Sequence, residues 1–463
     1  MVQTQIGLVG LGSMGLGLAE NLAEKGFEVF AWDEKSQINA NVSNTKNRKI
    51  TVCQTLRALV SSLKPSRTIL LCIPSGSPVT DVLTQLTEHL SKNDVVADCG
   101  NSHFHDTRCR ENHFRQFDIE FLGVGLSGGP DGARNGPSIM AGGSCSGWGR
   151  VQHCFEAISA KVDGEPCCAF FGQGGSGHYV KMVHNGIEYG VMHLLLETYA
   201  ILCRTSGNNN ERIAEVFNRL NSGQTASYLM DVTARVLAER RSGQGSFLVD
   251  EVDSRAEQKG TGVWTVQTAL DLGIPVPTIS EAVMFRQLSA ILEQSTGSNS
   301  VNASLSEWLS ENHTKLQDAI LLAILSTFAQ GISLLTAGKE AVGNELDVRA
   351  VLQTWAGGCV LEGAVINLLT KAFHKLGDGN DVLTSAALNR AVSKGIQPLR
   401  SLTMDAIFAG IPCSGLVSSL AYVESKRGSQ LPTSLTQLQR NYFGQHPIYN
   451  KWTGEPIKVL WRR

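Results

Sequence analysis

Four side chains that can exchange protons or form hydrogen bonds lie close together near the middle of the chain. Within the segment HYVKMVHNGIEYG they are Lys181, His184, Asn185 and Glu188. Read as a helix, their spacing places them on one face. A buried lysine with a lowered pKa can accept a hydroxyl proton, and a glutamic acid with a raised pKa can donate one. The segment therefore predicts an acid–base pair, Lys181 and Glu188, although a solvated helix face with one salt bridge would show the same periodicity.

Two further polar segments follow apolar runs. Asn101 comes after the run DVVADCG, and Ser127, Gly128 and Gly129 come after the run IEFLGVGL. Open parallel sheets bind their ligands at the carboxyl ends of their strands. Glycines there let backbone N–H groups approach a carboxylate. We expect both segments to line the reacting site, the alternative being that each is a simple turn.

A glycine-rich turn near the N-terminus predicts a dinucleotide site. It follows the apolar run QIGLV and opens a helical stretch, and this position between a strand and a helix strengthens a motif that is weak alone. Gly10 permits the tight turn, Gly12 lets the backbone approach a pyrophosphate, and Gly15 lets the helix pack against the sheet. The helix N-terminus then attracts the phosphates. The predicted cofactor contacts in this turn are Gly10, Leu11, Gly12, Ser13, Met14 and Gly15.

Two acidic residues after the second apolar run bear on cofactor choice. Asp33 and Glu34 directly follow the run FEVFAW, and an acid at about this distance from the glycines binds the 2′-hydroxyl of an adenosine ribose. The same acid repels the 2′-phosphate of NADP. This favours NAD, while Lys35 and Arg48 nearby keep NADP as the alternative.

The N-terminal part alternates apolar and helix-like segments. The apolar segments are Gln5–Val9, Glu28–Trp32, Thr68–Ile73, Asp94–Asp98 and Ile119–Val124. This alternation predicts a Rossmann-like α/β fold with a doubly wound parallel sheet. The glycine-rich stretch 171–178 permits a sharp change of direction. We therefore expect a dinucleotide-binding domain at residues 1–176.

Long helical periodicity dominates the rest of the chain. The clearest helical segments are Tyr179–Cys203, Glu211–Leu220, Thr278–Leu292 and Thr314–Leu335. Residues 293–310, rich in Ser, Asn and Glu, predict a polar loop. We expect a large all-α domain at 177–434. Prolines and glycines among aromatic residues predict an irregular C-terminal tail at 435–463, too apolar to be simply disordered.

Composition narrows the class of protein. The 463 residues carry a formal net charge of −2, so no positive field points to nucleic acid or an anionic membrane. The sequence shows no run of about 18 apolar residues, so we expect no membrane span, and no signal peptide is evident. The 11 scattered cysteines form no CxxC pairs and no regular disulfide framework, which indicates reduced thiols in a cytoplasmic protein.

The chain resembles decarboxylating 6-phosphogluconate dehydrogenases over nearly its whole length. The motifs that carry the resemblance are GLGSMG, GLSGGPDGARNGPSIMAGG, GHYVKMVHNGIEYG, QKGTGVWTVQTALDLGIPVPTISEAV and QRNYFGQHP. The resemblance implies oxidation of 6-phosphogluconate at C3, loss of CO2 and release of ribulose 5-phosphate, as in the pentose phosphate pathway, without a metal.

The resemblance also implies roles for individual residues. Lys181 is the general base on the 3-hydroxyl, and Glu188 is the acid that protonates C1 of the enediol. Arg440 and His446 match tail residues that reach the active site of the neighbouring subunit, which implies a homodimer with exchanged tails. Lysine and arginine donors suit the substrate phosphate. With Asn101, which we also expect to contact the cofactor, the predicted substrate-binding residues are Ser127, Gly128, Gly129, His184, Asn185, Tyr189, Lys259, Thr261, Arg286, Arg440 and His446.

Several departures from the family pattern leave alternatives open. NADP-using members usually carry Asn-Arg-Thr where this chain has Asp33, Glu34 and Lys35, and Pro74 and Pro130 replace a lysine and a glutamate. One alternative is a dehydrogenase for another β-hydroxy acid, which the retained phosphate-binding residues disfavour. A second is a catalytically silent dinucleotide-binding paralogue, which the intact acid–base pair disfavours.

Overall fold

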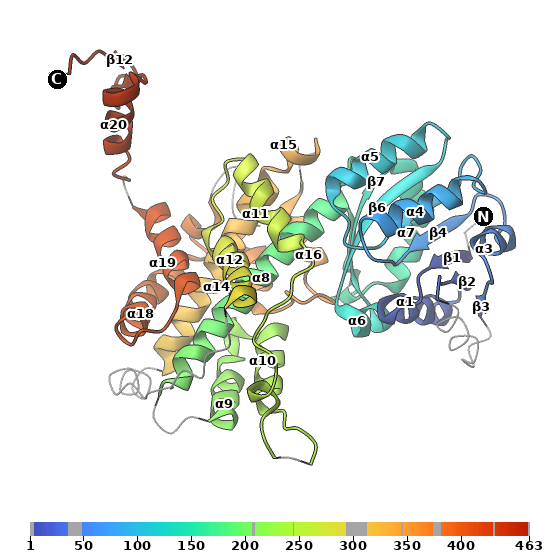
Figure 1. Ribbon diagram of the computed structural model, residues 1–463, viewed down its shortest axis with the longest axis horizontal. Helices are drawn as coiled ribbons and strands as arrows, with labels where there is room; N and C mark the ends of the chain where they lie inside the picture. Colours follow the sequence, from blue (N-terminus) through green and yellow to red (C-terminus); the bar gives the residue numbers. More distant parts are fainter. Residues whose placement is uncertain are drawn as a thin grey trace.

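The chain forms an N-terminal α/β part, a helical part beside it and a C-terminal segment that projects from the helical part (Figure 1). The computed structural model describes eight stretches of the chain, and the statements below refer to them. They are residues 4–35, 49–205, 209–243, 245–292, 313–343, 346–373, 381–428 and 431–461. The polar loop predicted at 293–310 lies outside the described residues.

The α/β part is built on an eight-stranded sheet with the order β10-β7-β6-β5-β4-β1-β2-β3. Its strands are β1 (Gln5–Val9), β2 (Glu28–Trp32), β3 (Ile50–Val52), β4 (Thr68–Leu71), β5 (Val95–Asp98), β6 (Glu120–Ser127), β7 (Ser138–Gly143) and β10 (Cys168–Phe170). The Rossmann-like prediction is confirmed, but the sheet is not wholly parallel. Strand β7 runs antiparallel to β6, because the short helix α6 (Gly129–Asn135) returns the chain directly beside it.

Helices cover both faces of this sheet, which explains why its central strands are apolar throughout. Side chains on alternate strand positions enter different cores: Leu8 packs with residues of α1 and α7, and Val9 with residues of α3, α4 and α5. The helices are α1 (Ser13–Glu24), α3 (Leu56–Ser62), α4 (Ser77–Thr87), α5 (Phe104–Arg115) and α7 (Cys145–Ile158). A two-stranded ribbon, β8 (Lys161–Val162) and β9 (Glu165–Pro166), precedes β10.

The helical part packs around α8 and α14, two long helices that both contribute heavily to its core. All four helical segments predicted from periodicity are confirmed, with ends that shift by up to three residues. The helices are α8 (Ser176–Cys203), α9 (Asn210–Leu220), α10 (Tyr228–Ala238), α11 (Thr261–Asp271), α12 (Pro277–Ile291), α14 (His313–Thr336), α15 (Gly338–Val342), α16 (Val348–Thr354), α17 (Ala364–Phe373), α18 (Asn389–Phe408) and α19 (Ser414–Arg427).

Helix α14 is long and apolar enough, by length and composition alone, to cross a membrane, although no such run was expected from the sequence. Of the 18-residue window that meets this criterion, 89% is buried inside the protein, and the helix packs against α18 and α8. Its apolar sequence is therefore accounted for by its place in the core.

The sequence predicted an irregular C-terminal tail, and this prediction is wrong. It forms helix α20 (Ser434–Gly444) and a small antiparallel pair, β11 (Ile448–Tyr449) and β12 (Pro456–Ile457). Pro432 and Pro447 lie outside the helix, where they do not interrupt its hydrogen bonds. Figure 1 shows this segment extending away from the rest of the protein beyond α19.

Candidate active site

Helix α8 lies directly against strand β6, and glycines in the strand make this close packing possible. A Cβ added at Gly125 would lie 2.3 Å from the Cβ of Lys181, and one added at Gly123 would lie 2.8 Å from the His178 ring. Because these positions carry no side chain, the helix sinks into the sheet surface. Lys181 is thereby buried beside the carboxyl end of β6, where Ser127 is the last residue.

A buried hydrogen-bonded group surrounds His184. The Ser127 Oγ lies 3.2 Å from His184 Nε2, and His184 Nδ1 lies 3.1 Å from Asn185 Oδ1 and 3.4 Å from Lys181 Nζ. The His184 pKa is held well below its usual value by burial and by Lys181, so the ring is neutral. With its hydrogen on Nδ1, it donates to Asn185 and accepts from the Ser127 hydroxyl at Nε2. This arrangement fixes the ring beside the lysine.

The two proposed proton-transfer groups have pKa values shifted toward each other. Burial lowers the pKa of Lys181, and the nearby Glu188 carboxylate only partly opposes this. Burial raises the pKa of Glu188, whose side chain remains 24% exposed and whose Oε2 lies 3.7 Å from His184 Nδ1. Both shifts favour the neutral forms that a base and an acid need. Since Lys181, His184 and Asn185 are buried, a solvated helix face is excluded.

The segment 355–359 packs against His184 and Gly128, and the sequence did not indicate a role for it. The buried Trp355 ring meets His184 edge-to-face at 5.4 Å, and its Nε1 donates to Met140 Sδ. A Cβ at Gly128 would lie 2.6 Å from the Gly358 carbonyl oxygen, so the Gly128 turn fits against this segment only as glycine. The available signal was the motif WAGGC, whose spacing alone indicates no contact.

A second set of predicted residues lies on the next turns of α8 and on its neighbours. The Arg286 guanidinium stacks over the Tyr189 ring at 3.7 Å, which holds an always-charged fork beside Glu188. Thr261 is buried at the start of α11, and Lys259 is exposed just before it. The structure thus brings Tyr189 and Arg286 together and places Lys259 at the edge of the same region.

Arg440 and His446 are not brought to this site within one chain. Both are exposed on the tail, where Arg440 donates to Gln437 at 3.2 Å and Asn441 donates to the His446 carbonyl oxygen at 2.7 Å. The prediction that they serve a neighbouring subunit remains a prediction.

The glycine turn after β1 is shaped to receive a dinucleotide. Gly10 has a φ of +96°, and a Cβ there would collide with the Cys72 carbonyl oxygen at 2.4 Å. A Cβ at Gly12 would meet nothing within 4 Å, so this backbone faces open space, and no side chain caps the N-terminus of α1. Asp33 Oδ2 accepts from the Leu11 backbone N–H at 2.8 Å, which fixes the acid beside the turn. These features fit a pyrophosphate at the helix N-terminus and a ribose at Asp33.

Asn101 is exposed in the loop after β5, and this loop is held by a buried carboxylate that sequence reasoning missed. Asp98 accepts hydrogen bonds from the Ser102 hydroxyl at 2.6 Å and the Gly100 N–H at 3.0 Å, and Arg110 pairs with it at 3.3 Å. The loop that carries Asn101 is therefore fixed from both sides.

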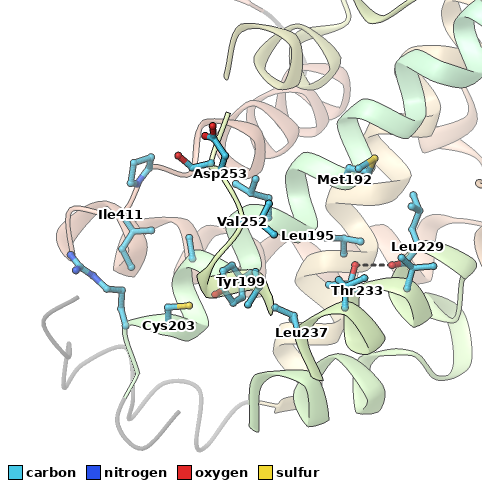
Figure 2. Close-up of a pocket in the computed structure, with 18 of the residues that line it drawn as sticks. Met192, Leu195, Tyr199, Cys203, Leu229, Thr233, Leu237, Val252, Asp253 and Ile411 are labelled. Atoms are coloured by element: carbon cyan, nitrogen blue, oxygen red, sulfur yellow. Dashed lines mark hydrogen bonds between the residues drawn. The ribbon is translucent and has the colours of Figure 1, made fainter. Parts of the chain in front are cut away.

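A separate apolar groove of about 950 Å³ lies along the C-terminal half of α8 (Figure 2). Figure 2 shows Leu195 and Tyr199 of α8 facing Thr233 and Leu237 of α10, with Val252 and Ile411 at its other sides. It shares no lining residue with the acid–base group. In the described parts of the chain, no group of three or more His, Cys, Asp or Glu side chains could hold a metal ion.

Comparisons with known proteins place nearly the whole chain in one family. The family described as the NAD binding domain of 6-phosphogluconate dehydrogenase matches residues 5–172, and its C-terminal domain family matches residues 177–461. The chain is 38% identical to 6-phosphogluconate dehydrogenase, decarboxylating 2, of Saccharomyces cerevisiae, covering 95% of this chain and 91% of that protein. It is 36% identical to the NADP(+)-dependent, decarboxylating 6-phosphogluconate dehydrogenase of Bacillus subtilis, with 96% of each covered.

Solved structures give the same result. The Plasmodium falciparum 6-phosphogluconate dehydrogenase, described in its apo form and in complex with NADP+ and with 6-phosphogluconate, superposes with a TM-score of 0.90. It is 30% identical, and the match covers 99% of this chain and 100% of that one.

Proposed function

Because the chain belongs to the 6-phosphogluconate dehydrogenase family, we propose that it oxidises 6-phosphogluconate at C3 and releases CO2 and ribulose 5-phosphate. It is an oxidoreductase with a domain for a nicotinamide dinucleotide. The observation that carries the proposal is the buried Lys181 beside Glu188 at the carboxyl end of β6, within reach of the stacked Arg286.

Lys181 acts first in the proposed reaction. When bound, the nicotinamide ring supplies a hydride acceptor for the hydrogen on C3. Neutral Lys181 takes the proton from the 3-hydroxyl, and the resulting ammonium then donates a hydrogen bond to the ketone oxygen. A ketone β to a carboxylate readily loses CO2, because the electrons of the broken C1–C2 bond form a C2–C3 double bond and displace the carbonyl electrons onto that oxygen, which gives an enediolate. The ammonium stabilises this developing charge.

Glu188 completes the reaction. After CO2 has left, the carbon that becomes C1 of the product must receive a proton. Burial raises the pKa of Glu188, which favours its protonated form, and the side chain is still partly exposed, so it can supply this proton and be reprotonated from solvent. Arg286 and Lys259 supply the positive charge that the substrate phosphate requires.

The test is a direct assay of the purified protein with 6-phosphogluconate and each dinucleotide. We expect reduction of dinucleotide, CO2 and ribulose 5-phosphate in equal amounts. Turnover only with a non-phosphorylated β-hydroxy acid would replace this proposal with another dehydrogenase activity. Dinucleotide binding without turnover on any such substrate would instead indicate a silent paralogue.

We further propose that NAD is the preferred cofactor, although the Bacillus subtilis relative is named for NADP(+). Asp33 is held against the glycine turn by the Leu11 N–H and by the Lys35 N–H, both at 2.8 Å. A carboxylate fixed there suits a ribose hydroxyl and repels a 2′-phosphate.

Exchanging the acidic pair is expected to reverse this preference. In Asp33→Asn/Glu34→Arg, kcat/KM with NADP should rise about 10- to 100-fold relative to NAD, because one charge-assisted hydrogen bond replaces a repulsion. The measurement is the ratio of kcat/KM values for the two dinucleotides in the wild type and the variant. A wild type that already prefers NADP would contradict our interpretation of Asp33.

We also propose a homodimer in which each tail completes the partner's site. Large apolar side chains are exposed on several helices of the helical part, including Ile291 on α12 at 80% and Phe408 on α18 at 84%. The tail itself exposes Phe443 and Trp452. Such surfaces are typical of interfaces. A second copy would cover them, and we assign the apolar groove of Figure 2 to the same covered surface.

Complementation between two inactive variants tests the exchanged tail. Lys181→Met and Arg440→Ala should each be nearly inactive, but coexpressed subunits should recover about a quarter of the wild-type activity. Half of randomly formed dimers are mixed, and each mixed dimer holds one site with both residues intact. If the tail serves its own subunit, the mixture will show no recovery.

A cytoplasmic location is proposed on the state of the cysteines. All 11 are free thiols in the structure, which suits a reducing compartment.

A further inference from the structure

The four residues 101–104 lie where the cofactor domain meets two helices of the substrate domain. Asn101 is the predicted ligand of this segment, and the next three residues each contact a different element. Ser102 is tied to the sheet through buried Asp98, to which it donates at 2.6 Å, and Arg110 Nη1 donates to the Ser102 Oγ at 3.2 Å. The loop is therefore rigid on its sheet side.

His103 makes the contact with helix α11. Its ring meets the Trp264 ring edge-to-face, with centroids 4.9 Å apart and planes at 73°. Trp264 lies in the first turn of α11, where its backbone N–H donates to the Gly260 carbonyl oxygen at 3.0 Å. A Cβ added at Gly260 would lie 3.2 Å from the Trp264 ring, so this ring covers the backbone between Lys259 and Thr261. His103 thus contacts the ring that supports two predicted substrate ligands.

The His103 ring is held in this orientation by its own helix. His103 precedes α5, and its Nδ1 accepts from the His105 backbone N–H at 3.2 Å, which caps the helix. It also stacks on the Phe104 ring at 4.8 Å. Phe104 adds a second link between the domains, because its ring meets the Tyr179 ring of α8 edge-to-face with centroids 5.2 Å apart.

We propose that His103 is a positioning residue that couples dinucleotide binding to substrate binding through Trp264. Because Ser102 fixes the loop on its sheet side, a nicotinamide bound against Asn101 acts on the opposite side of the loop, where the His103 ring contacts Trp264 at the start of α11. The inference rests on the proposed function for the identity of the substrate. It assigns His103 no contact with the reacting atoms.

The size of the coupling follows from the contact. An edge-to-face aromatic pair corresponds to about a 2- to 12-fold change in an equilibrium constant. Linkage requires the effect to be reciprocal: the dinucleotide changes the substrate affinity by the same factor as the substrate changes the dinucleotide affinity. A residue that merely stabilised the fold would change the substrate affinity by the same factor with and without dinucleotide. The ratio of these two substrate affinities, which measures the coupling, would then stay the same.

Two variants separate the ring contact from the helix cap. Asparagine is a favourable N-cap residue without an aromatic ring, so His103→Asn keeps the cap and loses the contact with Trp264. His103→Phe keeps a ring and loses the cap acceptor. His105→Asn is the matched control, because His105 stacks on His103 and makes no ring contact with Trp264 among the described residues.

The first measurement is the dissociation constant of 6-phosphogluconate with and without saturating reduced dinucleotide. The complex with reduced dinucleotide cannot turn over, because it holds no hydride acceptor. We expect the two constants to differ about 2- to 12-fold in the wild type, His105→Asn and His103→Phe, and to agree in His103→Asn. Coupling that survives in His103→Asn, or that is equally lost in His105→Asn, would overturn the inference. So would the absence of coupling in a wild type that binds both ligands.

A second measurement needs no substrate, so it separates this inference from the proposed function. The emission of Trp264 is isolated as the difference between proteins with tryptophan and with phenylalanine at this position. Dinucleotide should change this difference in the wild type and leave it unchanged in the His103→Asn background. An equal response in both backgrounds would refute the link, even if 6-phosphogluconate did not bind.

Discussion

Lys181→Met is expected to lower kcat for 6-phosphogluconate oxidation by about 10²- to 10⁴-fold, the usual contribution of a positioned general base. Methionine fills a similar volume against Gly125 and cannot accept a proton, so the packing of α8 on β6 should persist. The measurement is single-turnover formation of reduced dinucleotide, which reports hydride transfer alone. Substantial residual hydride transfer would mean that another group is the base.

The pH dependence gives this prediction a sign. Burial lowers the pKa of Lys181, so neutral amine is present at lower pH than for an exposed lysine. The rate of hydride transfer should therefore rise with pH as Lys181 loses its proton and become constant above its lowered pKa. Lys181→Arg is the control for charge, since a guanidinium keeps the positive charge but does not lose its proton in this range.

Glu188→Gln is expected to lower steady-state kcat by about 10²- to 10⁴-fold while sparing hydride transfer. Glutamine keeps the size of the side chain but cannot deliver a proton to the enediol. Mixing enzyme, dinucleotide and substrate should give a burst of reduced dinucleotide equal to the number of active sites, followed by slow turnover. The absence of a burst would place Glu188 before or at the oxidation step.

A second readout distinguishes protonation from a binding defect. In deuterated water, the wild type should place one deuterium at C1 of ribulose 5-phosphate with a single stereochemistry, because the proton comes from one fixed direction. Product formed by Glu188→Gln should carry deuterium in both orientations. Retained stereochemistry would assign proton delivery to a different residue.

Local patterns predicted much of the fold and of the site. The bounds of β1 and β2 match the apolar runs on either side of GLGSMG, because β1 is buried on both faces and β2 is buried on one face and half-buried at Phe30 and Trp32 on the other. The spacing of Lys181 and Glu188 also placed them correctly on one helix face, since helical periodicity is a property of the local chain.

Features that depend on contacts between distant segments could not be predicted in this way. The antiparallel strand β7 follows from how α6 returns the chain, and its sequence SIMAGG does not reveal a direction. In the sequence, Asp98 is simply a polar residue at the end of an apolar run. Its role in holding the loop depends on contacts with Ser102 and Arg110, which the sequence does not indicate. Trp355 contacts His184 across a separation in sequence that no motif spacing encodes.

The glycines of β6 also determine how this protein can come apart. Because Gly123 and Gly125 let α8 sink into the sheet, the 28-residue helix begins in one domain and ends in the core of the other. Removing the helix would leave the sheet with an uncovered face, and removing the sheet would expose the first turns of the helix to water. The two domains should therefore melt together in a single cooperative transition, so the folding unit is larger than either domain.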